Sequence, residues 1–211
     1  MPASSIYGDL HLENCRTLSL RFENGRLEKM AEQEERQSCL RGLLDREGAT
    51  FLVHISDWNP IRLSHLARKE MACLGVSPHS KRRKRKPSTI SIGQRRFFEH
   101  PAHDPLGHHD ADEKVGLLSL LDKRIRGLGG PAIVQVILTY RETDLDVAQF
   151  TTEGVFVREK KSLVTLGVYI LAESNGLRQS GYEAIGGVGG WEILRHKNPV
   201  KMAETVSRRV L

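Results

Sequence analysis

Glycines crowd one stretch of this chain, and that crowding limits how the stretch can fold more than any other feature of the sequence. Residues 176–192 read GLRQSGYEAIGGVGGWE and contain six glycines. Glycine in a strand costs conformational entropy and adds no packing surface. We therefore expect that the backbone bends sharply here or that another group approaches it closely.

The composition is typical of a globular protein, with 39% hydrophobic residues in a chain of 211. A chain of this length can form one large domain or two small ones. No apolar run approaches the roughly 20 residues that span a bilayer, and the N-terminus shows no secretory signal. Cys15, Cys39 and Cys73 are odd in number and widely spaced, which argues against a disulfide framework. We therefore expect a cytoplasmic protein without membrane association.

The net charge of +6 is concentrated in one run of basic residues. Six consecutive cations equal the whole excess: Lys81, Arg82, Arg83, Lys84, Arg85 and Lys86. Such a run can bind nucleic acid or another polyanion by neutralising phosphates. The run contains no aromatic residue for base stacking and adjoins Pro87 and Ser88, which favours a solvated loop. A stand-alone module that binds nucleic acid or protein through this loop remains the alternative.

Hydrophobic spacing predicts a sheet of many short strands and about three helices. Alternating runs predict strands at 6–13, 16–23, 26–32, 38–44, 50–56, 133–140, 144–150, 155–157 and 163–173. Asn24-Gly25 supplies the positive φ angles of a type I′ hairpin turn. Apolar residues at helical spacing predict helices after Asn59, over 112–127, and from Asn198 onward. This order predicts an α+β fold with a largely antiparallel sheet.

The same patterns predict three parts along the chain. Residues 1–74 form an N-terminal β-meander with a helix, and 112–211 form a helix, antiparallel strands and a terminal helix. Between them, 75–111 is predicted as a basic and histidine-rich linker or loop, because Pro, Ser, His and cations interrupt the hydrophobic pattern there.

Histidines and carboxylates gather at the end of this linker and form the one metal-like constellation of the sequence. The group comprises His100, His103, His108 and His109 with Asp104, Asp110 and Asp112. Imidazoles and carboxylates of this kind can bind zinc or nickel. The alternative, which we favour, is a polar loop in which Asp110 or Asp112 caps the following helix, because the group contains no cysteine.

Several segments resemble one protein family. They are YGDLHLE at 7–13, ENGRLE at 23–28, GATFLVHISDWN at 48–59, DPL at 104–106, LGVYILA at 166–172, RQSGYEAIGGVGGWE at 178–192, and the last helix at 199–211. Together they are similar to the N-terminal half of the TldD/PmbA family, also called modulators of DNA gyrase, and resemble its TldD branch. One departure is SCLRGLLD at 38–45, where the family usually carries a run rich in glycine and valine.

The resemblance implies a cytoplasmic zinc metallopeptidase system that cuts unfolded or flexible peptides. In the family, two histidines of an HExxxH helix and a later cysteine hold the zinc, and the helix glutamate is the general base. This sequence contains no such motif. We therefore expect no catalytic residue and no cofactor in this chain, zinc in a missing C-terminal half, and no activity of the chain alone. The expected role is a substrate-channel and dimerisation portion, whose partners are the catalytic half or a family subunit, and a peptide.

The glycine-rich stretch also contains the candidate substrate-binding residues. They are Arg178, Gln179, Ser180, Gly181, Tyr182, Glu183, Gly186 and Gly187. Their polar groups could bind a peptide that runs beside an exposed strand. A surface hairpin held by an Arg178–Glu183 ion pair is the alternative, and the sequence leaves both open.

Overall fold

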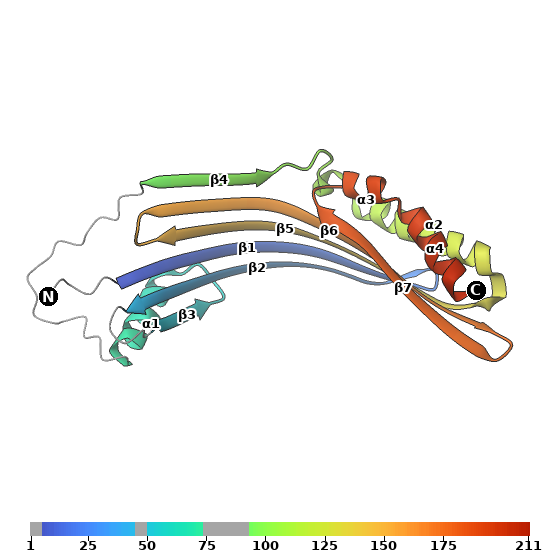
Figure 1. The fold of residues 1–211 in the computed structure, drawn as a ribbon, viewed down its shortest axis with the longest axis horizontal. Coiled ribbons are helices and arrows are strands. Elements are labelled where there is room, and N and C mark those ends of the chain that lie inside the picture. The colour runs from blue at the N-terminus through green and yellow to red at the C-terminus, as the bar shows by residue number, and fades with distance from the viewer. Residues whose placement is uncertain (1–5, 45–49, 74–92) are drawn as a thin grey trace, which may run out of the picture. The chain divides into compact units, whose positions relative to one another are not determined.

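A computed structural model describes residues 6–44, 50–73 and 93–211. The strands are β1 (Ile6–Glu23), β2 (Arg26–Leu44), β3 (Thr50–Ile55), β4 (Gln94–His100), β5 (Ile133–Thr151), β6 (Val155–Ser174) and β7 (Leu177–Val188). The helices are α1 (Pro60–Cys73), α2 (Ala111–Gly129), α3 (Glu192–Lys197) and α4 (Pro199–Val210), with short 3-10 turns η1 (Leu106–His108) and η2 (Gly130–Ala132). Figure 1 shows their arrangement. None of the helices among these residues is long and apolar enough to cross a membrane.

The strands form one antiparallel sheet of seven, in the order β3-β2-β1-β5-β6-β4. Strand β7 also pairs with β6, in a register that joins Leu163 to Val188 and Ser174 to Leu177. The predicted α+β fold, with a largely antiparallel sheet and three longer helices, is confirmed.

Four strands are much longer than the sequence pattern predicts. Each of β1, β2, β5 and β6 is a single strand of 18 to 20 residues where the pattern predicted two short ones. The predicted breaks fall on polar runs such as 158–162 in β6. These runs continue the sheet because backbone pairing requires no apolar side chain, and their charges pair with each other. In β6 and β5, for example, Arg158 Nη2 lies 2.6 Å from Asp146 Oδ2.

The chain divides into two compact units, and the four long strands contribute residues to both. Unit 1 comprises Met1–Cys15, Glu34–Glu99 and Leu145–Lys160, and unit 2 comprises Arg16–Gln33, His100–Asp144 and Lys161–Leu211. Each unit is therefore discontinuous in the sequence. Strand β4 forms within the stretch where we predicted a linker or loop, and all seven of its residues are exposed. A strand that buries neither face has no alternation for the pattern to detect.

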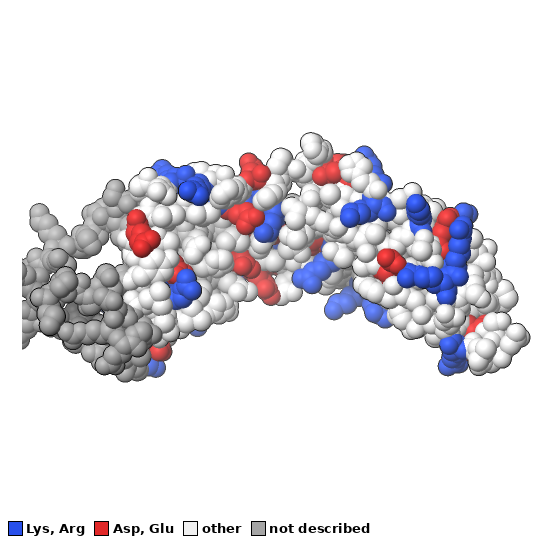
Figure 2. Space-filling model, in the orientation of Figure 1, with Lys and Arg blue, Asp and Glu red and all other residues white. Residues whose placement is uncertain are grey.

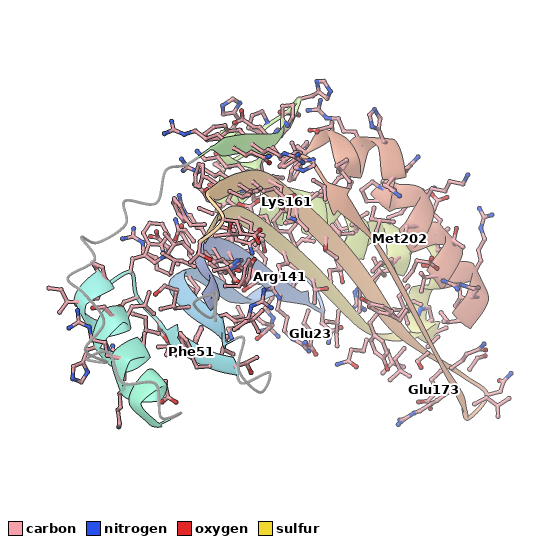
Figure 3. All side chains as sticks on the ribbon, turned by 60° about the vertical axis from the view of Figure 1, so that its left-hand side comes forward. Glu23, Phe51, Arg141, Lys161, Glu173 and Met202 are labelled. Carbon is pink, nitrogen blue, oxygen red and sulfur yellow. The ribbon has the colours of Figure 1, made fainter. Side chains whose placement is uncertain are left out.

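The core of unit 1 lies between β3 and α1. Phe51, Val53 and Ile55 alternate with exposed residues along β3 and pack with Leu63 and Ala67 of α1. Figure 3 labels Phe51 on this strand. The alternation gives β3 one buried face, and the spacing of four residues gives α1 a matching stripe.

The core of unit 2 lies between one face of the sheet and helices α2 and α4. Its fully buried members include Leu118, Leu121 and Ile125 of α2, Val206 of α4, Leu138 of β5, and Val164, Leu166, Val168 and Ile170 of β6. Each such side chain contributes roughly 1.5–3 kcal/mol of hydrophobic free energy. Met202, labelled in Figure 3, lies on the same buried face of α4.

Side-chain caps fix where helices α2 and α4 of unit 2 begin. The carboxylate of Asp110 accepts a hydrogen bond from Glu113 N at 2.8 Å, so Asp110, one of the two predicted candidates, caps α2. The amide oxygen of Asn198 accepts from Lys201 N at 3.0 Å, and Pro199 occupies the first turn of α4. Each cap satisfies a backbone N–H group that the helix itself leaves unpaired.

Candidate functional site

The glycine-rich stretch is approached closely by the chain itself. A Cβ atom on Gly181 would lie 2.7 Å from Val210 Cγ1, so the absence of a side chain lets α4 pack against β7. A Cβ atom on Gly190 would lie 2.0 Å from Asp104 O, and the neighbouring Trp191 N–H donates a hydrogen bond to that oxygen at 2.7 Å. Gly190 therefore permits a close approach of two backbone segments, and Gly181 permits close packing of helix side chains on the strand.

The predicted substrate-binding residues divide between the two faces of β7. Side chains alternate along a strand, so residues with odd numbers point one way and residues with even numbers point the other. On the helix side, Gln179 Nε2 donates to Arg209 O at 3.0 Å and Glu183 forms an ion pair with Arg209. On the same side, Gly181 faces Val206 and Val210 of α4, and Gly187 faces Ile193 of α3. The other four, Arg178, Ser180, Tyr182 and Gly186, lie on the face that no described helix covers.

The alternative Arg178–Glu183 ion pair is wrong. Arg178 Nε instead donates to Glu173 Oε2 at 2.6 Å, and these two residues are register partners across the β6–β7 hairpin. Glu183 pairs with Arg209 of α4. Residues five positions apart in a strand point to opposite faces, which excludes the expected pair. Figure 3 labels Glu173 near the tip of this hairpin.

The open face of the sheet in unit 2 contains a hollow of about 460 Å³. Its lining residues are Ser19, Leu20, Arg21, Lys29, Thr139, Tyr140, Arg141 and Thr165. Sequence reasoning missed this group. The available signal was the alternation of β5, in which buried Leu138 and Tyr140 place Thr139 and Arg141 on the opposite face. Figure 3 labels Arg141 on β5.

Part of the predicted site lies beside this hollow. A Cβ atom on Gly167 would lie 2.7 Å from Thr139 Oγ1 and 3.2 Å from the Tyr182 hydroxyl. Tyr182 is 63% exposed, and Gly186 is the register partner of Thr165. Because Gly167 has no side chain, Thr139 of the lining and the predicted binding residue Tyr182 can both approach its backbone.

Of the predicted histidine group, the structure brings His109 and Asp104 together in a cluster with Glu113 and Trp191. His109 Nδ1 lies 2.8 Å from Glu113 Oε2, its Nε2 lies 2.9 Å from Asp104 Oδ1, and its ring stacks on Trp191 at 4.5 Å between centroids. Burial opposes its protonation most strongly, but the hydrogen bonds with Asp104 and Glu113 raise its pKa above the usual value. Across residues 6–44, 50–73 and 93–211, no three or more His, Cys, Asp or Glu side chains are placed to hold a metal.

Glu192 fastens the loop before α2 to the turn after β7. Its carboxylate accepts hydrogen bonds from the backbone N–H groups of His103 at 3.2 Å, Asp104 at 3.0 Å and Gly190 at 2.9 Å. Burial raises its pKa, but these backbone hydrogen bonds outweigh that effect and lower the pKa below the usual range. Asp104 Oδ2 also lies 2.9 Å from Arg195 Nη2. This contact is an ion pair, but its geometry is not that of a hydrogen bond. The contacts of its backbone with Glu192 and of Asp104 with Arg195 therefore hold the histidine-rich loop in place.

A buried ion pair lies next to this cluster and was not predicted. Lys114 Nζ donates to Glu142 Oε1 at 2.9 Å, and Lys114 is only 3% exposed. The Tyr140 hydroxyl donates to the other carboxylate oxygen of Glu142. Burial and the adjacent Glu142 raise the pKa of Tyr140 well above its usual range, so its hydroxyl keeps the proton that it donates.

Basic residues also occur on the helix side of unit 2. Figure 2 shows blue side chains gathered over α3 and α4, where Arg208 and Arg209 occupy the last turn of α4. The predicted polyanion-binding run, Lys81 to Lys86, lies outside the described residues.

Comparison with known proteins gives one family and several similar folds. The model of the PmbA/TldA metallopeptidase central domain matches residues 104–211, about half of the chain. None of the curated proteins matches significantly. A protein of Thermotoga maritima named as a modulator of a DNA gyrase has a TM-score of 0.65 at 15% identity, over 96% of this chain and 43% of its own. A similarly named protein of Bacteroides thetaiotaomicron gives 0.61 at 11%, over 97% and 45%. TldE of Thermococcus kodakarensis gives 0.61 at 11%, over 97% and 43%. The chain thus spans less than half the length of these solved chains.

Proposed function

The chain belongs to the PmbA/TldD metallopeptidase family, and on that premise we propose that it supplies one wall of a channel for unfolded or flexible peptides. The observation that carries the proposal is the open sheet face of unit 2 with its hollow of about 460 Å³. A volume of this size falls within the usual range of ligand sites. The hollow lies on an open sheet face, which suits an extended chain better than a compact folded one.

The polar groups of the face suit a peptide backbone. Hydroxyl groups of Ser19, Thr139 and Thr165 line the hollow and can each donate or accept a hydrogen bond. Tyr182 beside them offers an exposed ring with a polar tip, on which peptide side chains of different kinds can pack. Such contacts hold a peptide without demanding one particular sequence.

The described residues do not fit the zinc ion that the family name implies. They contain no group of three or more ligand side chains, whereas a catalytic zinc needs three protein ligands and an open position. In our proposal the metal and the general base come from a further part of the protein or from a family subunit that associates with it. The role of this chain is then to bind and align the peptide, and its assignment to the TldD branch is part of the same proposal.

Site-specific photo-cross-linking tests where a peptide binds. Benzoylphenylalanine would replace Thr165 or Tyr182 on the open face, and Lys123 of α2 would be the matched exposed control. A fluorescent, uncharged and unstructured peptide of about 20 residues would serve as the probe. We expect cross-links from positions 165 and 182 and a background level from position 123. Equal cross-linking at all three positions, or none on the sheet, would overturn the proposal.

A further inference from the structure

The charge of the hollow points to a class of peptide. We propose that it preferentially binds acidic segments, through the cationic side chains of Arg141, Lys29 and Arg21. This inference rests on the proposed function of the open sheet face and adds a preference for carboxylate-bearing substrate.

The described residues that line the hollow include these three cations and no carboxylate. Arg21 is partly neutralised, because its Nη2 donates to Glu23 Oε2 at 2.8 Å. Hydrogen bonds from Gln135 and then Arg21 lower the pKa of Glu23, so that partner stays ionised at neutral pH. Neither Arg141 nor Lys29 has an ion-pair partner within the parts of the chain that the structure describes. The positive charge of the hollow therefore comes chiefly from Arg141 and Lys29.

The groups around these cations suit a carboxylate. A guanidinium presents paired N–H donors that match the two oxygens of a carboxylate, and such charged hydrogen bonds are stronger than neutral ones. The hydroxyls of Thr139 and Thr165 lie in the same lining and can donate to the same anion. A glutamate or aspartate side chain of a peptide lying on the face would meet both kinds of donor.

A phosphate backbone would also be attracted by these cations, but the lining lacks the other feature that single-stranded nucleic acid needs. Proteins of that kind stack bases on exposed aromatic rings. Tyr140 is the one aromatic residue among the described lining residues, and it is only 1% exposed. Beside the hollow, the exposed Tyr182 offers one ring, whereas single-strand binding proteins stack successive bases on several rings. The surface thus favours an acidic peptide, and binding of nucleic acid becomes an outcome of the test.

Fluorescence anisotropy of labelled probes with the 211-residue protein tests the preference. The probes are unstructured peptides that alternate Ser with Glu, Gln or Lys, and an oligothymidylate of equal length. The test variant is Arg141→Gln with Lys29→Gln. The matched control is Lys123→Gln with Lys197→Gln, which removes the same charge from exposed positions on α2 and α3. A second variant, Arg141→Lys with Lys29→Arg, keeps the charge.

We expect the Glu peptide to bind more tightly than the Gln peptide, and the Lys peptide most weakly. The test variant should weaken binding of the Glu peptide by roughly three- to tenfold, the scale of two exposed ion pairs, and leave the Gln peptide unchanged. The control variant should bind as the unmodified protein does. The charge-preserving variant should lose less affinity for the Glu peptide than the test variant, because it keeps both charges and only moves the guanidinium group.

Each negative result of the binding experiment would overturn a different part of the proposal. If Glu and Gln peptides bind equally, the channel wall stands and the acidic preference is wrong. If no peptide binds, the proposed function fails and the preference fails with it. If the control variant loses as much affinity as the test variant, general charge explains the binding and the hollow is not the site. Oligothymidylate binding as tight as that of the Glu peptide, with the same loss in the test variant, would overturn the assignment to peptides.

Discussion

His109 and Trp191 stack with their ring planes 17° apart, while both nitrogens of the imidazole face carboxylate oxygens. A neutral imidazole carries one N–H group and can donate to only one of the two acids, Asp104 and Glu113. Both contacts become donor–acceptor pairs only when the ring is protonated. The geometry and the raised pKa therefore both favour the imidazolium form of His109.

The first prediction concerns the pH dependence of stability. The pKa of His109 is raised in the folded state, so its contribution is fully present below the ordinary histidine value of about 6.5 and is lost as pH rises through the raised folded value. We expect His109→Gln to lower the unfolding free energy by about 1.5–3 kcal/mol at pH 6 and by less at pH 8.5. Urea denaturation of both proteins at the two pH values measures this difference.

The emission of Trp191 gives an independent readout of the same titration. In a Trp58→Phe background, Trp191 is the remaining tryptophan, and it is 8% exposed. Its fluorescence should change over the pH range in which the stability difference between the parent and His109→Gln disappears. A flat profile, together with a stability loss that is equal at both pH values, would show that His109 packs as a neutral ring.

The second prediction concerns the close approach of α4 to β7. Gly181→Ala places a methyl group 2.7 Å from Val210 Cγ1 and 3.1 Å from Val206 Cγ1, so α4 must move or its valines must change rotamer. We expect a loss of about 1–3 kcal/mol in the free energy of unfolding. Gly116→Ala on α2 is the matched control, because nothing lies within 4 Å of its new methyl group. The control should be neutral or more stable by up to about 1 kcal/mol, since alanine favours the helix.

Chemical denaturation of the two glycine variants distinguishes this account from a purely entropic one. If Gly181→Ala were as stable as the parent or more so, α4 would not be in tight contact with β7 at this position. Glycine would then be explained at position 181 by backbone freedom alone.

The sequence was sufficient to predict the family, the α+β class and the three longer helices. The sequence pattern divided each long strand into two short ones, because a polar run such as 158–162 has the composition of a turn. In the structure, β6 continues through this run without a break. Helix starts were easier to predict, since Asp110 and Asn198 act on backbone groups only three residues away. Features such as helix caps, whose partners are close in the sequence, can therefore be predicted from the sequence.

The candidate site was harder to predict because its residues come from separate strands. Arg21, Thr139 and Thr165 come from β1, β5 and β6 and line one hollow, and no local sequence pattern predicts that they lie together. The glycine-rich stretch did signal close approach, yet the approaching groups were Val210 and Asp104 of the same chain. Whether Tyr182 and its open-face neighbours bind substrate stays a prediction, which the cross-linking experiment addresses.

The third prediction concerns the buried Lys114–Glu142 pair. Lys114→Met removes the cation and leaves the partly buried Glu142 carboxylate with the Tyr140 hydroxyl as its remaining hydrogen-bond donor among the described residues. An unpaired buried charge is expensive, so we expect a loss of about 3–5 kcal/mol in the free energy of unfolding. Adding Glu142→Gln should restore a large part of that loss, because the neutral amide still accepts the tyrosine hydrogen bond and no longer carries a buried charge. Thermal and urea unfolding of the single and double variants measure the coupling. If the double variant were no more stable than Lys114→Met, packing of the lysine stem rather than its charge would explain the cost.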